Sequence, residues 1–131
     1  MMKQIETDIC IIGAGSGGLS VAAGAAQMGA RVVLIEEGEM GGDCLNHGCV
    51  PSKALLAASA RVPRPTYAEA MAHVRASIAA IAPHDSQERF EGLGVRVIRA
   101  RGAFIGPKTV RAGEAEIEAR RFVVATGSRP M

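Results

Sequence analysis

Tryptophan is absent from the 131-residue sequence, and only three phenylalanines and one tyrosine supply aromatic rings. Basic and acidic residues nearly balance, 15 against 13, which leaves a formal net charge of +2. No basic cluster interleaved with aromatic residues occurs, so nucleic acid is not an expected partner. No apolar run is long enough to cross a bilayer, and the N-terminus lacks the layout of a signal peptide. Membrane association is therefore not expected either.

Cysteine is also scarce, with three residues and no sign of a secretory context. This predicts a cytoplasmic protein, in which a disulfide is usually catalytic rather than structural. Hydrophobic residues make up 48% of the chain, many of them small. Such a composition favours an α/β domain, because small residues let helices lie close to a parallel sheet. The length suits one domain over residues 1–131.

A glycine-rich segment near the N-terminus has the context of a dinucleotide-binding turn. Residues 7–12 are apolar and predict a buried strand. The sequence GAGSGG at 13–18 then opens a helix expected over 16–28, and a second strand is expected over 31–35. Strand, turn, helix and strand in this order predict a Rossmann-like unit, although a purely structural glycine turn is the alternative. The pattern alone does not separate NAD from FAD.

Each position of this segment has a physical role. Gly13 permits the tight turn, Gly15 lets the backbone approach a pyrophosphate, and Gly18 allows the helix to pack closely on the strand. Unpaired amides at the helix start face the phosphates, and Glu36 accepts hydrogen bonds from a ribose. The predicted dinucleotide-binding residues here are Gly13, Gly15, Ser16, Gly17, Gly18 and Glu36.

Cys44 and Cys49 lie five positions apart, just after a pair of glycines. In a regular helix their Cα atoms would be roughly 8.7 Å apart, whereas a disulfide needs less than about 7 Å. A bridge therefore requires an irregular turn, which we expect to lead into a helix over 50–61. Three interpretations compete: buried structural thiols, a metal site with His47, and a redox-active dithiol whose thiolate is stabilised at a helix N-terminus.

The string GGDCLNHGCVPSK at 41–53 resembles the redox motif of the flavin-dependent pyridine nucleotide–disulfide oxidoreductases. This family includes dihydrolipoamide dehydrogenase, glutathione reductase and mercuric reductase. The resemblance implies FAD as the dinucleotide, Cys49 as the thiol on the flavin side and Cys44 as the interchange thiol. Lys53 matches the lysine near the reactive edge of the flavin. Further cofactor contacts implied by the resemblance are Gly42, Gly102, Thr126 and Gly127.

The rest of the chain predicts two more helices and several strands. Thr66 and Glu69 form a capping box before a helix whose apolar stripe is expected to be core or a helix-pairing seam. That stripe consists of Tyr67, Met71, Val74, Ile78 and Ile81. A short capped helix should end near Gly92.

Strands are expected over 95–101, 115–119 and 122–125, the last of them buried, with an antiparallel meander over 102–119. We expect Cys10 to be buried and His73 and His84 to be solvated.

The predicted fold is α/β: a Rossmann-like parallel sheet with flanking helices and a small antiparallel β-meander, as a fragment of a larger multidomain fold. The resemblance implies a segment of an enzyme that passes electrons from NAD(P)H through FAD to the Cys44–Cys49 disulfide. It also implies a small-molecule disulfide or a metal ion as substrate, no resident metal, and a homodimer for the full-length protein. This chain alone is not expected to turn over. The alternatives are an NAD-binding Rossmann dehydrogenase domain and a metal-handling module built on cysteine and histidine.

Overall fold

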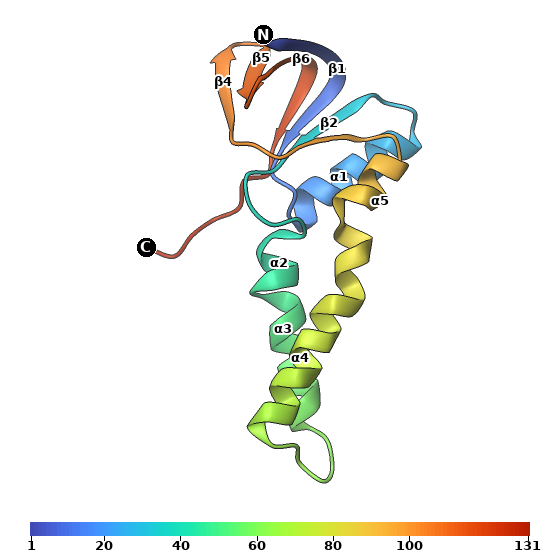
Figure 1. Cartoon of the computed structure of the whole chain (residues 1–131), viewed down its shortest axis with the longest axis vertical. Helices are drawn as coiled ribbons and strands as arrows, with labels where there is room; N and C mark the ends of the chain where they lie inside the picture. Colours follow the sequence, from blue (N-terminus) through green and yellow to red (C-terminus); the bar gives the residue numbers. More distant parts are fainter.

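The structure, a computed structural model, describes all residues from Met1 to Met131. One six-stranded sheet lies at one end of the molecule, and a hairpin of helices projects from it (Figure 1). The strands are β1 (Lys3–Ile12), β2 (Val32–Ile35), β3 (Arg96–Ile98), β4 (Gly102–Gly106), β5 (Thr109–Ala112) and β6 (Ala115–Val124). Their order in the sheet is β3-β2-β1-β6-β5-β4. The α/β class is thereby confirmed.

Four strands form the parallel part of the sheet. β1 lies between β2 and β6 and is parallel to both, and β3 adds a parallel edge beside β2. The prediction that residues 8–12, 31–35 and 121–125 form parallel neighbours is confirmed. β4 and β5 run antiparallel to their neighbours and, with the first half of β6, form the meander predicted at 102–119.

The predicted strand limits were wrong at β1, β3 and β6; β3 covers only Arg96–Ile98 of the expected 95–101. β1 begins at Lys3, and β6 is a single strand where two were predicted, because Lys3 pairs with Ala115 and the register continues to the end of both strands. The polar residues that alternate in these segments hid this pairing. The predicted burial of 122–125 was also wrong, since Val124 is 66% exposed and no element covers it.

Helices cover one face of the parallel part of the sheet and the meander covers the other, which explains why β2 is apolar and buried throughout and why β1 ends in an apolar run. On one face, α1 (Ser16–Gln27) and α5 (Gln87–Gly92) pack on the strands through a core that includes Leu19, Phe90 and Ile11. On the other, the meander closes a second core that includes Val110 and Cys10. Cys10 is fully buried, as predicted, and burial raises the pKa of its thiol to about 12.

The projecting hairpin consists of α2 (Gly42–Asn46), α3 (Cys49–Ser59), α4 (Tyr67–Ile81) and the 3₁₀ turn η1 (Ala82–Asp85). α3 and α4 lie side by side (Figure 1), and their buried residues are Ala54, Ala58, Ala70 and Val74. Small side chains at this seam let the two helices approach closely.

The predicted stripe on α4 was therefore only partly right. Val74 is buried, but Tyr67 is 78% exposed in the first turn of the helix, beside the loop that joins α3 to α4. His73, predicted to be solvated, is half-buried and contacts the guanidinium of Arg61.

Capping residues set the start of α4 and α5. The predicted capping box is present: Thr66 Oγ1 accepts from the amide of Glu69, and Glu69 Oε2 accepts from the amide of Thr66 at 2.7 Å. The amide and the hydroxyl of Thr66 both donate to the Glu69 carboxylate, which holds the pKa of Glu69 below its ordinary value. Ser86 caps α5, which ends at Gly92 as predicted. No helix in the chain has the length and apolarity that a membrane span requires.

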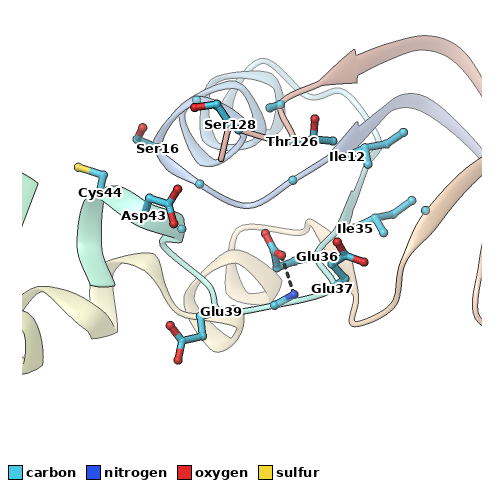
Figure 2. A pocket seen from close by; sticks show the side chains of 18 of the residues that line it. Ile12, Ser16, Ile35, Glu36, Glu37, Glu39, Asp43, Cys44, Thr126 and Ser128 are labelled. Carbon is cyan, nitrogen blue, oxygen red and sulfur yellow. Dashed lines mark hydrogen bonds between the residues drawn. The ribbon is translucent and has the colours of Figure 1, made fainter. Parts of the chain in front are cut away.

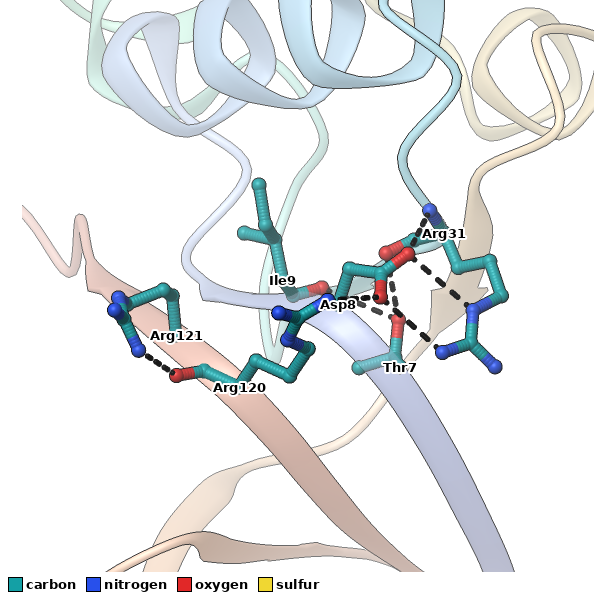
Figure 3. A network of polar contacts seen from close by, with 6 residues as sticks. All are labelled: Thr7, Asp8, Ile9, Arg31, Arg120 and Arg121. Atoms are coloured by element: carbon teal, nitrogen blue, oxygen red, sulfur yellow. Dashed lines mark hydrogen bonds and ion pairs between the residues drawn. The ribbon is translucent and has the colours of Figure 1, made fainter.

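Asp8 joins three strands at the face of the sheet shown in Figure 3. Its carboxylate accepts from the backbone amide of Arg31 at 2.9 Å and from two nitrogens of the same guanidinium at 3.2 and 3.3 Å. Nη1 of Arg120 on β6 lies 3.8 Å away. The hydrogen bonds from Arg31 are the main reason that the pKa of Asp8 lies below its ordinary value. The start of β2 is thus tied to β1 and β6.

Candidate functional site

A cavity of about 820 Å³ opens where β1, β2 and β6 end at their carboxyl ends, the usual place for ligands in parallel α/β sheets (Figure 2). Most residues predicted to bind a cofactor line it. These are Gly13, Gly15, Ser16, Gly17, Glu36, Gly42, Gly102, Thr126 and Gly127, together with Cys44. Segments far apart in the sequence therefore meet at one site.

Three predicted residues do not line the cavity. Gly18 lies beneath the turn, where a Cβ would be 1.8 Å from the carbonyl oxygen of Gly13. The helix and the turn thus touch, as expected of a third fingerprint glycine. Cys49 and Lys53 are exposed and lie outside the cavity wall. Their assignment to the flavin side remains a prediction.

The turn after β1 holds the first wall of the cavity. Gly13 has a φ of +108°, and a Cβ there would lie 2.1 Å from the carbonyl oxygen of Ala125, just after β6. No side chain fits between these two segments. α1 begins at Gly15 as its N-cap, without any side chain that caps its first amides. Those amides are available to an anionic ligand.

The second wall of the cavity is the segment that follows β2, and Glu36 links it by hydrogen bonds to the turn after β1. Its Oε2 accepts from the amide of Ala14 at 2.7 Å. Its Oε1 accepts from the amide of Gly38, also at 2.7 Å (Figure 2). Each carboxylate oxygen can accept more than one hydrogen bond, so the side chain can still receive the hydroxyls of a ribose. Glu36 thus serves both the structure of the site and the binding expected of it.

The dithiol segment forms the third wall. As predicted, it is irregular: α2 ends at Asn46 and α3 begins at Cys49. The side-chain amide of Asn46 donates through its Nδ2 to the carbonyl oxygens of Gly42 at 2.9 Å and Met40 at 3.2 Å. These two hydrogen bonds hold the short turn together. The segment also touches the phosphate turn, since a Cβ on Gly42 would lie 2.7 Å from the Cα of Gly15.

Cys44 and Cys49 both carry free thiols, one half-buried and the other exposed. Interaction with the neighbouring Cys49 thiol is the main cause that raises the pKa of Cys44, and partial burial and nearby Asp85 raise it further. The ammonium of Lys53 acts in the opposite direction. The two thiols are thus near enough to affect each other's titration, while Cys10 lies in the core. The redox role of the pair stays a prediction.

Sequence reasoning missed several charged residues of the cavity wall. Glu37, Glu39, Asp43 and Arg101 all line it. Glu37 and Glu39 follow a predicted strand closely, but no spacing rule shows which charged residues face the cavity. His47 also lines the wall, with its Nε2 3.5 Å from Glu39 Oε2. The metal-site interpretation of Cys44, His47 and Cys49 finds no support, because no three potential ligands of this kind converge.

A family model described as pyridine nucleotide-disulphide oxidoreductase matches residues 7–131. The chain belongs to this family. It is 32% identical to a dihydrolipoyl dehydrogenase of Geobacillus stearothermophilus, over 97% of this chain and 31% of that protein. It is 34% identical to a glutathione reductase of Burkholderia cepacia, over 99% of this chain and 32% of that protein.

A solved structure gives the same answer for the fold. The HOCl-induced flavoprotein disulfide reductase RclA from Escherichia coli, as its Cu(II) complex, matches with a TM-score of 0.83 at 25% identity. That match covers 95% of this chain and 28% of RclA. The chain therefore spans about a third of the length of the relatives that it matches. It corresponds to part of a larger flavoprotein disulfide reductase fold.

Proposed function

We propose that this chain supplies the FAD-binding and dithiol segment of an FAD-dependent pyridine nucleotide–disulfide oxidoreductase. The observation that carries the proposal is the shared cavity. A turn with uncapped helix amides, the ribose-binding candidate Glu36 and the thiol of Cys44 all line it. Amides for a pyrophosphate, an acid for a ribose and a dithiol are the three elements that such an enzyme needs side by side.

The cavity wall fits an extended dinucleotide. Backbone can approach a ligand closely at Gly13 and Gly15, which have no side chain to intervene, and the amides of Ser16 and Gly17 stand at the start of α1. Gly102, Thr126 and Gly127 line the same wall from two later segments. Bound FAD would supply electron transfer between NAD(P)H and the disulfide.

The chemistry left to this chain is thiol–disulfide exchange. Reduction of the Cys44–Cys49 disulfide takes up two electrons and two protons and yields two thiols. The Cys44 thiolate then attacks a sulfur of the substrate disulfide, which breaks that bond and releases one substrate thiolate. Attack by Cys49 on the mixed disulfide releases the second thiolate and restores the bridge. Lys53 favours the thiolate form of Cys44 in these steps.

We propose a small molecule with a disulfide or dithiol as the substrate class. The names of the relatives support this class, since one is a dihydrolipoyl dehydrogenase and another a glutathione reductase. A metal-ion substrate, as for a mercuric reductase, is the second candidate within the family. The homodimer and the cytoplasmic location expected from the family resemblance and the cysteine content belong to the same proposal.

The binding half of the proposal is tested with a Gly17→Asp variant. A Cβ at Gly17 meets no atom within 4 Å, and the first turn of α1 has no acidic residue. The new carboxylate should therefore stabilise the helix, by about 0.3–1 kcal/mol, while it repels a pyrophosphate. Calorimetric titration with ADP and with FAD should show that the natural chain binds both ligands and that the Gly17→Asp variant binds neither.

Gly24→Asp is the matched control, because Gly24 lies on the same helix and its Cβ also meets no atom within 4 Å. This variant should bind ADP as the natural chain does. Equal binding by natural chain and Gly17→Asp, or no binding by either, would contradict the proposed pyrophosphate site. We expect the chain to bind FAD only slightly more tightly than ADP, since the walls of this cavity surround only part of FAD.

The dithiol half is tested by oxidation with glutathione disulfide. Two electrons and two protons should leave Cys44 and Cys49 and produce two molecules of glutathione, with one internal bridge. Peptide mapping should find Cys10 still as a thiol. A stable mixed disulfide on either cysteine, or a bridge that includes Cys10, would contradict the proposed exchange mechanism.

A further inference from the structure

A second cavity, of about 520 Å³, opens into the core that the meander closes. Its volume lies within the usual range for small-molecule sites. It is separate from the cavity of the candidate functional site, since Ala100 is the only residue that lines both. The proposed function assigns no ligand to this second cavity.

A gap in the sheet accounts for the second cavity. β2 begins opposite Ile9 of β1, so residues 3–7 of β1 have a partner strand on the β6 side only. β3, which lies beyond β2 in the sheet, forms the opposite wall. The β5–β6 turn closes one side, because a Cβ on Gly113 would lie 3.5 Å from the Cβ of Ala100. The start of β1 and this turn lie at the end of the sheet away from the helical hairpin (Figure 1).

The floor of the second cavity is apolar and belongs to the core. Its residues, which pack in the core beneath the meander, are Ile5, Ile98, Ala100, Ala112 and Ala115. Three of the five are alanines, whose short side chains leave the space between β3 and the β5–β6 turn unfilled. A ligand that enters the cavity therefore needs an apolar body.

The rim of the second cavity is basic. Lys3, Arg96 and Arg99 line it, and the only acidic residue among the lining residues is Glu114. Arg99 donates to the carbonyl oxygen of Gly38, whereas the structure shows no ion pair or side-chain hydrogen bond for Lys3 or Arg96. Two cationic side chains from two different strands are thus free to bind an anion.

Both of these cations lie on the side of their strands that faces the floor. Side chains two positions apart in a strand share a face, so Lys3 lies on the same face as Ile5, and Arg96 on the same face as Ile98. Each cation is thereby placed next to an apolar floor residue, at opposite walls of the cavity.

We propose that the second cavity binds a small amphiphile, with its apolar body on the floor and its anionic head group between Lys3 and Arg96. Burial of apolar surface on the floor favours any apolar body and does not select a head group. The excess of basic side chains selects an anion, because a negatively charged head group gains charge-assisted hydrogen bonds there and a cation is repelled. The ligand class is therefore a short hydrocarbon chain that carries one anionic group.

The test titrates the natural chain with decanoate, with decanol, which lacks the charge, and with acetate, which lacks the apolar chain. Calorimetry at low ionic strength, below the micelle concentration, should show that decanoate binds more tightly than decanol and that acetate does not bind measurably. Lys3→Gln and Arg96→Gln should each weaken decanoate binding roughly threefold to tenfold and leave decanol binding unchanged.

The floor is tested with Ala115→Leu, whose larger side chain should occupy part of the second cavity and weaken decanoate and decanol alike. Lys108→Gln is the matched control for the charge variants, because Lys108 is an exposed lysine of the β4–β5 turn that does not line the cavity. It should bind decanoate as the natural chain does. Thermal unfolding should show that the variants are folded, and the two charge variants still decide the question if Ala115→Leu is not.

Failure of the natural chain to bind decanoate would overturn the inference. So would equal affinities for decanoate and decanol, or decanoate binding that Lys3→Gln and Arg96→Gln both leave unchanged. Saturating ADP should leave decanoate binding unchanged, and competition between the two would place decanoate in the cavity of the candidate functional site and contradict the inference. None of these outcomes bears on the pyrophosphate site, so the inference and the proposed function can fail independently.

Discussion

Gly15 and Gly42 are in backbone contact, although all of α1 and β2 separates them in the chain: a Cβ on Gly42 would lie 2.7 Å from the Cα of Gly15. Gly15 is the N-cap of α1 in the phosphate turn, and Gly42 starts the dithiol segment. Their contact sets the distance between the two, so that the dithiol cannot move relative to the turn without loss of backbone packing.

We predict that Gly42→Ala destabilises the chain by about 1–3 kcal/mol. The added methyl group meets backbone atoms, and Gly42 also has a φ of +59°, which an alanine adopts only with strain. Gly24→Ala is the control, since its Cβ meets nothing and the helix should gain about 0.5–1 kcal/mol. Urea unfolding measures both. A Gly42→Ala variant as stable as the natural chain would show that the two backbones can separate freely.

The second prediction concerns the pH dependence of Cys44 alkylation. Its pKa is raised, mainly by interaction with the neighbouring Cys49 thiol, so Cys49→Ala should lower the pKa and speed alkylation at neutral pH. Asp85→Asn should act in the same direction, whereas Lys53→Gln should raise the pKa and slow the reaction. Rates of reaction with iodoacetamide, followed on the Cys44 peptide, give the profiles. Alkylation profiles that do not move in Cys49→Ala would contradict an interaction between the two thiols.

Cys10 should behave differently from the other two cysteines. It is fully buried, and burial alone raises its pKa to about 12. At neutral pH a reagent therefore cannot reach the sulfur, and the group is a thiol rather than a thiolate. We expect two thiols to react with a thiol reagent in the folded chain and a third to react only in denaturant. Labelling of three thiols at equal rates without denaturant would show that the core is open.

The last prediction uses the lowered pKa of Asp8. A carboxyl group with a folded pKa below its ordinary 3.8 stabilises the fold above that pH and loses the contribution as pH falls through the folded value. Asp8→Asn should therefore lower the melting temperature near neutral pH, and the difference from the natural chain should shrink in strong acid. Glu118→Gln on β6 is the control, because the structure shows no ion pair or side-chain hydrogen bond for Glu118. A gap that stays constant with pH would mean that the Asp8 charge is not involved.

Local features of the fold were readable from the sequence. The glycine fingerprint, the capping box of Thr66 and Glu69 and the burial of Cys10 each depend on residues within a few positions, and each appears in the structure. Features set by distant segments were not. The extension of β1 back to Lys3 depends on a partner strand more than a hundred residues later, which no local pattern shows.

In the candidate site, too, local features were readable from the sequence and contacts between distant segments were not. Gly13 and Glu36 were identified by their spacing, but the contact of Gly13 with Ala125 and the hydrogen bond from Ala14 to Glu36 come from three-dimensional packing. Tyr67 shows the opposite error. Its place in an apolar stripe predicted burial, whereas α3 meets α4 through alanines and leaves the ring outside.

The pairing of β1 with β6 has a consequence for how the molecule is made. Lys3 pairs with Ala115 and Ile12 with Val124, so the central strand of the sheet lacks one neighbour until residues 115–124 have been made. Closing so long a loop delays folding, because its entropy is lost before the contacts form. Until then the edge of β1 that faces β6 presents unpaired backbone N–H and C=O groups to any other strand. The helical hairpin, whose contacts are local, can form long before that.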